Sequence, residues 1–316
     1  MMKHNILELV TSYRKTVLLL TLYRLGFFDV VSSEPIEAKE ISNKLGINHE
    51  FLMMLLNTLE TLEVVHQTST GWYIDIAVSQ FKSLFEHELN LYNKYVTPEY
   101  LLKSLKSYPD ERPFTNEGFS LKEAKDYFSL MNGKSLQLLA LLVSRKVSRK
   151  TPVNYLEFGR SLGGMGAYFQ KIFKSMTIDV VLDQHDIPVF EEQICPQYPK
   201  VPTIYTDLGE ITIAKRYQLI CVYNTVHYYK TDELLAKFIK FKHCLSAEGL
   251  LCIMDIFLDN RPQNSLYTLD WITHGGVYHL TLKEIENLLL QAGLTVAKSL
   301  YHAETSMHIL FARRGK

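Results

Sequence analysis

At residues 154–166 the chain reads Asn154-Tyr155-Leu156-Glu157-Phe158-Gly159-Arg160-Ser161-Leu162-Gly163-Gly164-Met165-Gly166. A short apolar run ends at an acid, a glycine turn follows, and residues 167–173 continue with a helical pattern. A strand, a tight turn and a helix in this order open the nucleotide-binding part of α/β domains. The spacing Glu-x-Gly-x-x-x-Gly predicts a pocket in which the backbone approaches a ligand closely. Arg160 and Ser161 stand where such loops usually carry glycine, so we expect an altered pocket.

Strand-like and helix-like segments alternate from residue 153 onward, which predicts a mainly parallel sheet covered on both faces. The clearest helix is 232–245, which we expect Thr231 to cap and Gly249 to follow in a turn. Thr281 and Glu284 form a capping-box sequence for a helix that ends at Gly293. Two strands then follow with no helix between them, which predicts a terminal antiparallel hairpin. The expected strands are 155–158, 178–182, 203–205, 219–223, 250–256, 295–300 and 307–312.

The N-terminal part is predicted to be mainly helical and to end in a small hairpin. Helices are expected at 5–28, 36–46 and 50–62, the last capped by Asn48, and the hairpin at 64–74. This order is typical of a winged helix. DNA binding is disfavoured because residues 1–80 carry six basic and nine acidic side chains, and the apolar segment 49–63 contains no Lys or Arg. A dimer interface or a substrate lid explains that apolar helix better.

The bulk composition is that of a globular protein with about two domains. The chain has 316 residues, a formal net charge of zero and 47% apolar residues, so nothing draws it as a whole to nucleic acid or to a membrane. Its four cysteines form no Cys-x-x-Cys pair, and Cys221 and Cys252 lie in apolar runs, which favours reduced core thiols. No leader or membrane span is evident, so we expect a cytoplasmic protein. The predicted division is a winged-helix dimerisation domain at 1–106, a linker with interdomain helices at 107–150, and a Rossmann-like domain at 151–316.

Three side chains that follow predicted strands are candidates for contact with a nucleotide, because ligands of open α/β sheets bind beyond the carboxyl ends of the strands. Asp183 comes 26 residues after Glu157 and suits ribose hydroxyls. Asp207 and Leu208 form an acid and apolar pair that suits the amino edge and the face of adenine. Each signal is weak by itself, but the Glu157 loop, Asp183 and Asp207 follow three successive strands, and together they are a much stronger signal.

With these residues in place, the chain resembles the S-adenosylmethionine-dependent small-molecule O-methyltransferases that carry an N-terminal winged-helix dimerisation domain. This group contains plant caffeate-type enzymes and bacterial natural-product methyltransferases. The resemblance covers almost the whole chain and implies a class I methyltransferase α/β fold, a homodimer and S-adenosylmethionine as cofactor. It is carried by residues 25–29, the Glu157 loop, Asp183, residues 206–208, Val226-His227-Tyr228-Tyr229, residues 247–249 and the segment 274–293.

The resemblance also implies roles for individual residues. His227 falls on the general base, which takes a proton from a hydroxyl, and Asp255, 28 residues later, falls on the acid that orients it. A histidine hydrogen-bonded at a strand end for structural reasons is the alternative for His227. The predicted cofactor residues are Glu157, Gly159, Ser161, Gly163, Asp183, Asp207, Leu208, Tyr223 and Asn224. The predicted substrate residues are Met131, Tyr228, Trp271, His274 and Tyr278, although core packing is an alternative for Met131.

Several positions depart from the family pattern and leave an aromatic, less acidic cavity. Arg160 and Ser161 replace glycine, Tyr228 and Tyr229 replace an Asp and a Trp, and Tyr223 stands where plant members often have a lysine. Such aromatic residues suit a sulfonium cation or an apolar polyene or polyketide. No metal is predicted, because the histidine pairs lack a carboxylate at ligand spacing.

The function predicted from the sequence is O-methylation of a small aromatic or polyketide-like metabolite. One alternative is a methyltransferase fold repurposed for cyclisation, decarboxylation or a pericyclic step in natural-product biosynthesis, with the cofactor structural or lost. The other is a non-catalytic ligand-binding protein.

Overall fold

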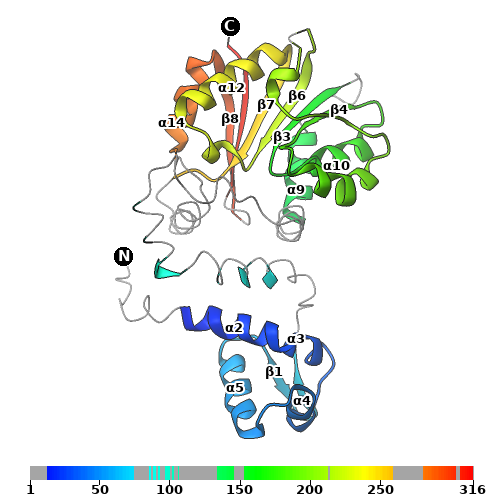
Figure 1. Cartoon of the computed structure of the whole chain (residues 1–316), viewed down its shortest axis with the longest axis vertical. Coiled ribbons are helices and arrows are strands. Elements are labelled where there is room, and N and C mark those ends of the chain that lie inside the picture. The colour runs from blue at the N-terminus through cyan, green and yellow to red at the C-terminus, as the bar shows by residue number, and fades with distance from the viewer. Residues whose placement is uncertain are drawn as a thin grey trace. The chain divides into compact units, whose positions relative to one another are not determined.

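The computed structural model describes residues 13–74, 134–145, 153–212, 214–258, 280–303 and 307–315, with scattered positions between 85 and 106 (Figure 1). The chain divides into two compact units, Met1–Leu91 and Tyr92–Lys316. No helix among these described residues combines the length and the apolar character that a bilayer crossing requires.

The N-terminal unit consists of helices followed by a two-stranded hairpin, which is the predicted order of elements. Gly26, in the left-handed region at φ 78°, ends α2 (Tyr13–Leu25), as its glycine predicts, and residues 27 and 28 belong to the separate helix α3 (Phe27–Val30) instead of the predicted helix 5–28. Asn48 caps α5 (His49–Thr61) as predicted, since its Oδ1 accepts the N–H groups of Glu50 and Phe51 at 2.9 and 3.2 Å. The elements are α2 (Tyr13–Leu25), α3 (Phe27–Val30), α4 (Ala38–Leu45), α5 (His49–Thr61), β1 (His66–Thr68) and β2 (Gly71–Tyr73).

The larger unit is built on a seven-stranded sheet with the order β5-β4-β3-β6-β7-β9-β8 among the described residues. The strands from β5 to β7 are parallel, and β9 runs antiparallel to both β7 and β8. The predicted parallel sheet with a terminal hairpin is therefore confirmed. The strands are β3 (Asn154–Gly159), β4 (Thr177–Val181), β5 (Thr203–Tyr205), β6 (Tyr217–Tyr223), β7 (Leu245–Asp255), β8 (Leu294–His302) and β9 (Met307–Arg314).

Helices cover both faces of this sheet, as its continuous apolar strands require. The helices α9 (Lys134–Ser144) and α10 (Gly164–Ile172) pack on one face, and α12 (Thr231–Cys244) and α14 (Leu282–Gln291) pack on the other (Figure 1). Successive residues of β3 enter opposite cores, since Tyr155 packs with α10 and Leu156 packs with α12. Short helical turns lie at α11 (Ile187–Val189), Phe190–Ile194, Cys195–Gln197, η5 (Leu208–Glu210) and η6 (Val226–Tyr228).

The junction of α12 and β7 differs from the prediction. Thr231 is the first helical residue, and the N-cap is Lys230, whose backbone N–H donates to the Glu233 carboxylate at 2.9 Å. The strand β7 begins directly after the helix, so Gly249 lies inside the strand instead of a turn. A Cβ at Gly249 would lie 2.8 Å from the carbonyl oxygen of Tyr217, so the close approach of two strands requires glycine there.

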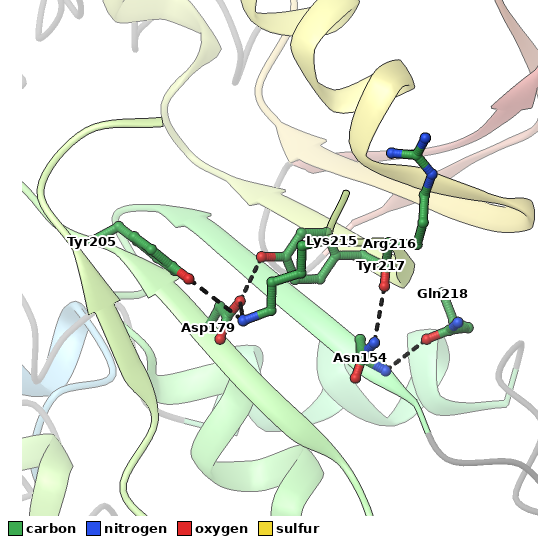
Figure 2. A network of polar contacts seen from close by, with 7 residues as sticks. All are labelled: Asn154, Asp179, Tyr205, Lys215, Arg216, Tyr217 and Gln218. Carbon is green, nitrogen blue, oxygen red and sulfur yellow. Dashed lines mark hydrogen bonds and ion pairs between the residues drawn. The ribbon is translucent and has the colours of Figure 1, made fainter. Parts of the chain in front are cut away.

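A buried acid joins β4 to the segment that leads into β6 (Figure 2). Asp179 is fully buried, and its Oδ2 lies 2.5 Å from Lys215 Nζ and accepts the Tyr217 hydroxyl at 2.5 Å. Burial lowers the pKa of Lys215, but the hydrogen bond and charge of Asp179 outweigh this and leave it above its usual value. Asp179 Oδ1 has no hydrogen-bond partner within the described ranges. The sequence did not indicate this network.

Candidate functional site

The loop after β3 is held by the buried carboxylate of Glu157. This side chain accepts the Ser161 hydroxyl at 2.5 Å, the N–H groups of Gly163 and Gly166 at 2.9 and 2.6 Å, and the Tyr155 hydroxyl at 3.0 Å. Burial raises the pKa of Glu157, and the hydrogen bonds from Ser161 and Gly166 lower it again in part. Three residues predicted from the sequence, Glu157, Ser161 and Gly163, therefore meet, and the carboxylate fixes the loop that precedes α10.

Two glycines allow this loop to lie against the end of β6. Gly159 has φ 113°, and a Cβ there would overlap the carbonyl oxygen of Tyr223. That same oxygen accepts the N–H of Arg160 at 2.9 Å. Gly163 has φ 89° and is the N-cap residue directly before α10, and its carbonyl accepts the Tyr198 hydroxyl at 2.5 Å. The backbone of the loop thus meets the carboxyl end of a neighbouring strand, at the edge where open α/β sheets bind ligands.

The acids after β4 and β5 are exposed at this same edge. Asp183 follows β4 and is exposed. Asp207 is exposed and begins η5, where its Oδ1 accepts the N–H of Gly209 at 2.5 Å, and Leu208 beside it is buried. The three residues occupy the positions expected for contact with a ribose and an adenine, and their contacts with a cofactor remain a prediction.

The segment after β6 carries a buried histidine–carboxylate pair. His227 Nδ1 lies 2.9 Å from Asp255 Oδ1, and both side chains are buried. Asp255 ends β7, and its Oδ2 accepts the N–H groups of Thr225 and Val226 at 2.8 and 2.9 Å. Both oxygens of Asp255 accept backbone N–H groups, so the carboxylate is an acceptor that suits an Nδ1–H donor, and this tautomer leaves the lone pair of the ring on Nε2, which is shielded from solvent. This geometry suits a general base and the residue that orients it.

Tyr223 and Asn224 connect β6 to this pair. Asn224 adopts a left-handed backbone at φ 46°, and its N–H donates to the carbonyl of Met254 at 2.8 Å. Non-glycine residues in this region are often found at functional sites, where the surrounding structure stabilises them. Tyr223 is buried, and burial together with the charge of Asp255 raises its pKa, so its hydroxyl stays neutral.

The two tyrosines that follow His227 each lie beside a cation, and Tyr228 also lies beside the histidine. The Tyr228 ring lies 4.3 Å from the His227 ring, and the guanidinium carbon of Arg160 lies 4.9 Å from the centre of the Tyr228 ring. Lys237 Nζ lies 4.2 Å from the centre of the Tyr229 ring. Burial, followed by the charge of Asp183, raises the pKa of Tyr229 to about 12, which keeps this hydroxyl protonated at neutral pH. Tyr223, Tyr228 and Tyr229 lie within the described residues, and the aromatic cavity predicted from them stays a prediction.

Arg160 also contacts the segment after β4. Its guanidinium lies 3.3 Å from Asp186 Oδ2, and His185 Nε2 lies 3.6 Å from Asp186 Oδ1. Burial raises the pKa of Asp186, and the positive charge of Arg160 offsets part of that rise. The ligand atoms of Asp183, His185 and Asp186 lie within 4.8 Å of one another, a spacing compatible with a cation, although the sequence predicts no metal. Sequence reasoning missed Asp186 and Tyr198, because neither ends a strand nor belongs to a motif.

Four of the predicted substrate residues, Met131, Trp271, His274 and Tyr278, lie outside the described residues. The fifth, Tyr228, lies within the described residues, and its ring lies beside that of His227.

Comparison with known proteins gives a family match for the N-terminal unit and structural matches for the whole chain. The family of O-methyltransferase dimerisation domains matches residues 7–81. The mitomycin 7-O-methyltransferase MmcR shares 16% identity and a TM-score of 0.73, over 98% of this chain and 97% of that one. Human N-acetylserotonin methyltransferase, solved in complex with SAM, shares 13% identity and a TM-score of 0.78, over 100% of both chains.

A third match is a putative O-methyltransferase from Nostoc punctiforme, with 17% identity and a TM-score of 0.72 over 97% of this chain and 98% of that one. A sequence search of curated proteins finds no match. The matches confirm the predicted fold class, an α/β class I methyltransferase fold that follows an O-methyltransferase dimerisation domain.

Proposed function

We propose that this protein is an S-adenosylmethionine-dependent O-methyltransferase that acts on a small aromatic or polyketide-like metabolite. The observation that carries the proposal is the buried pair of His227 and Asp255, 2.9 Å apart at the carboxyl edge of the sheet. On the other side of β3, the exposed acids Asp183 and Asp207 follow β4 and β5. The dimerisation-domain match and the fold shared with O-methyltransferases support the same function.

S-adenosylmethionine fits this edge at its nucleoside end. The exposed carboxylates of Asp183 and Asp207 can accept hydrogen bonds from ribose hydroxyls and from an adenine amino group. Leu208 offers an apolar surface for the adenine ring, and Gly159 keeps the loop free of a side chain at the end of β3. When bound, the cofactor supplies an electrophilic methyl group.

The histidine pair can activate the acceptor hydroxyl. Nε2 of His227 takes the hydroxyl proton, and the imidazolium formed keeps its Nδ1–H donated to Asp255. The negative charge of Asp255 stabilises that imidazolium, and the N–H groups of Thr225 and Val226 hold the carboxylate in place. His227 lies beside Tyr228, which gives an aromatic acceptor a ring to pack against.

The test is methyl transfer from methyl-labelled S-adenosylmethionine to a panel of phenols and hydroxylated polyketides. We expect His227→Ala to lower turnover by about 10²- to 10⁴-fold, the usual contribution of a general base. Asp255→Asn should also lower turnover, because it replaces one acceptor oxygen with an NH₂ donor facing N–H groups and removes the negative charge that stabilises the imidazolium. The matched control is His243→Ala, which removes an exposed histidine on α12 and should leave turnover unchanged.

Equal turnover of wild type and His227→Ala would refute the assignment of the base. Conversion of an acceptor without transfer of label would support the alternative of a repurposed enzyme that catalyses a non-methylating step.

The N-terminal unit is proposed to be of the winged-helix type and to form a homodimer through α5. Phe51 and Met54 lie one turn apart on this helix and are 68% and 67% exposed, which is unusual for large apolar side chains that are neighbours. The double change Phe51→Glu and Met54→Glu should convert the dimer into monomers, measured by size-exclusion chromatography with light scattering. Glu60→Lys, an exposed polar change on the same helix, is the control. A double variant that stays dimeric at micromolar concentration would place the interface elsewhere.

A further inference from the structure

A second buried histidine, His308, lies beside the carboxylate that orients the proposed base. It is the second residue of β9, it is 5% exposed, and it is the register partner of Asp255 on β7 and of Tyr301 on β8. Two positions further along, Ile253 and Leu310 are also paired, and both lie in the core under α12 and α14. Because side chains alternate along a strand, Asp255 and His308 project toward this same face of the sheet.

Ring contacts agree with this position. The centre of the His308 ring lies 5.8 Å from that of Phe257, which belongs to the same core, and 5.1 Å from that of Tyr301. Residues directly opposite in an antiparallel pair have Cβ atoms about 4.5–5.5 Å apart. The side chain of His308 therefore lies beside Asp255 on the β9 side of β7, while His227 meets the same carboxylate from the β6 side.

The groups that face His308 differ between the elements packed around it. On β7 the facing group is the carboxylate of Asp255, and on β8 it is the phenol ring of Tyr301. The two helices over this face contribute apolar side chains to the core, namely Leu234, Phe238 and Phe241 from α12 and Ile285, Leu288 and Leu289 from α14. In such apolar surroundings, a charge on the ring acts strongly on the carboxylate beside it.

One carboxylate thus lies between two imidazoles. Its Oδ1 pairs with His227 Nδ1 at 2.9 Å, and its Oδ2 accepts two backbone N–H groups, which fixes Asp255 toward the base. A protonated His308 places a positive charge on the other side of Asp255. Two titratable groups that interact in this way titrate as a pair, because a proton on one disfavours a proton on the other.

We propose that His308 is a positioning residue that controls the strength of the base through Asp255. The inference rests on the proposed function. Neutral His308 leaves the negative charge of Asp255 to stabilise the imidazolium that forms on His227. Protonated His308 offsets part of that charge, so His227 becomes a weaker base and methyl transfer slows as the pH falls.

The experiment measures the single-turnover rate of methyl transfer between about pH 5 and about pH 9, the range in which histidine titrates. The acceptor is the phenol that wild type converts fastest, and the proteins are wild type, His308→Phe and His302→Phe. Phenylalanine keeps a ring in the core and removes the titrating nitrogens. His302 on β8 is the register partner of Met307, which lies in the core on the other face of the sheet, so His302→Phe controls for the loss of a histidine.

In wild type, the logarithm of the rate should fall with decreasing pH more steeply than the slope of about 1 that a single proton gives, because a proton on either histidine slows transfer. His308→Phe should bring the slope to about 1 and keep the rate at high pH within about twofold of wild type, while His302→Phe keeps the wild-type slope. A slope of 1 in wild type would overturn the inference. A uniform loss of rate in His308→Phe with the slope retained would also overturn it, since a purely structural role has that effect.

Proton NMR of the histidine rings provides a second test that needs neither turnover nor a variant of His308. Asp255→Asn should lower the apparent pKa of His308 by about one unit, because the anion beside the ring is lost. An unchanged titration of His308 would refute the inference alone. Absence of methyl transfer from wild type to every acceptor would refute the proposed function and, with it, the inference.

Discussion

The ion pair between Asp179 and Lys215 allows a quantitative test of how β4 is fixed to the segment before β6. The two charged groups lie 2.5 Å apart, with side-chain exposures of 1% for Asp179 and 30% for Lys215 (Figure 2). Lys215→Met leaves the Asp179 carboxylate buried without its cation. The Tyr217 hydroxyl still donates a hydrogen bond to it. The decrease in the free energy of unfolding therefore includes the cost of burying an unpaired negative charge.

The expected magnitude follows from the exposures of the two partners. Breaking a fully buried ion pair costs about 3–5 kcal/mol, and an exposed pair contributes about 0.2–1 kcal/mol. Because water can reach the Lys215 side, we expect Lys215→Met to lower the free energy of unfolding by about 2–3 kcal/mol. Asp179→Asn should cost about 1–2 kcal/mol. In the double variant the two losses overlap, which gives a coupling energy of about 1–2 kcal/mol.

The assay is a double-mutant cycle by urea unfolding, followed by circular dichroism, with hydrogen exchange of β4 to localise the effect. The control cycle uses Glu40→Gln and Lys44→Met on α4, a pair 2.8 Å apart with exposures of 54% and 52%. Its coupling should be about 0.3–0.5 kcal/mol and should vanish in high salt. A coupling between Asp179 and Lys215 no larger than the control value would refute this reasoning.

Two further predictions concern the loop glycine and the buried tyrosines. Gly159→Ala should lower the free energy of unfolding by about 2 kcal/mol or more, because the alanine would have a positive φ and its Cβ would overlap the Tyr223 carbonyl oxygen. Gly46→Ala is the control: its φ is 65°, but the space around the added Cβ is open. It should lower the free energy of unfolding by about 1 kcal/mol in the same urea assay. Burial raises the pKa of Tyr155, Tyr217 and Tyr223, so the folded state keeps protons that the unfolded chain releases above about pH 10. These three groups alone should then lower the free energy of unfolding by about 4 kcal/mol per pH unit above pH 10, and Tyr198 and Tyr229, whose pKa burial also raises, add to that fall. Unfolding at pH 9 and pH 11 measures it, and no fall would contradict the neutral state of these tyrosines.

The sheet could be predicted because its strands are short apolar runs between recognisable turns. The five parallel strands and the final hairpin all lie within a few residues of their predicted positions. The error at Gly249 arose because α12 passes into β7 at Cys244 and Leu245 without any turn residue between them. Glycine there is explained by a contact with Tyr217, more than thirty positions earlier, and sequence spacing carries no information about such a contact.

The candidate site was predictable where function depends on a strand end. Glu157 ends an apolar run, so local pattern was enough to single it out, whereas His227 and Asp255 were singled out by the family resemblance. Asp179 was not predicted, because it lies within a strand, where an acid only interrupts the apolar pattern. Its partner Lys215 is 36 positions away in the sequence. Asp186 was missed for the same reason, since its contact with Arg160 depends on how two loops meet.

The two residues that replace glycine in the loop after β3 have different physical consequences. Neither position needs glycine for its backbone, because the left-handed residues of this loop are Gly159, Leu162 and Gly163. The Ser161 hydroxyl is fully buried and donates to Glu157, so that substitution is absorbed into the hydrogen bonding that shapes the loop. The Arg160 guanidinium instead lies 4.9 Å from the centre of the Tyr228 ring and 3.3 Å from Asp186 Oδ2. The Ser161 side chain is thus part of the hydrogen bonding that shapes the loop, whereas Arg160 places a cation beside Asp186 and Tyr228. A substitution at Ser161 should therefore remove one hydrogen bond to Glu157, and a substitution at Arg160 should leave all of them in place.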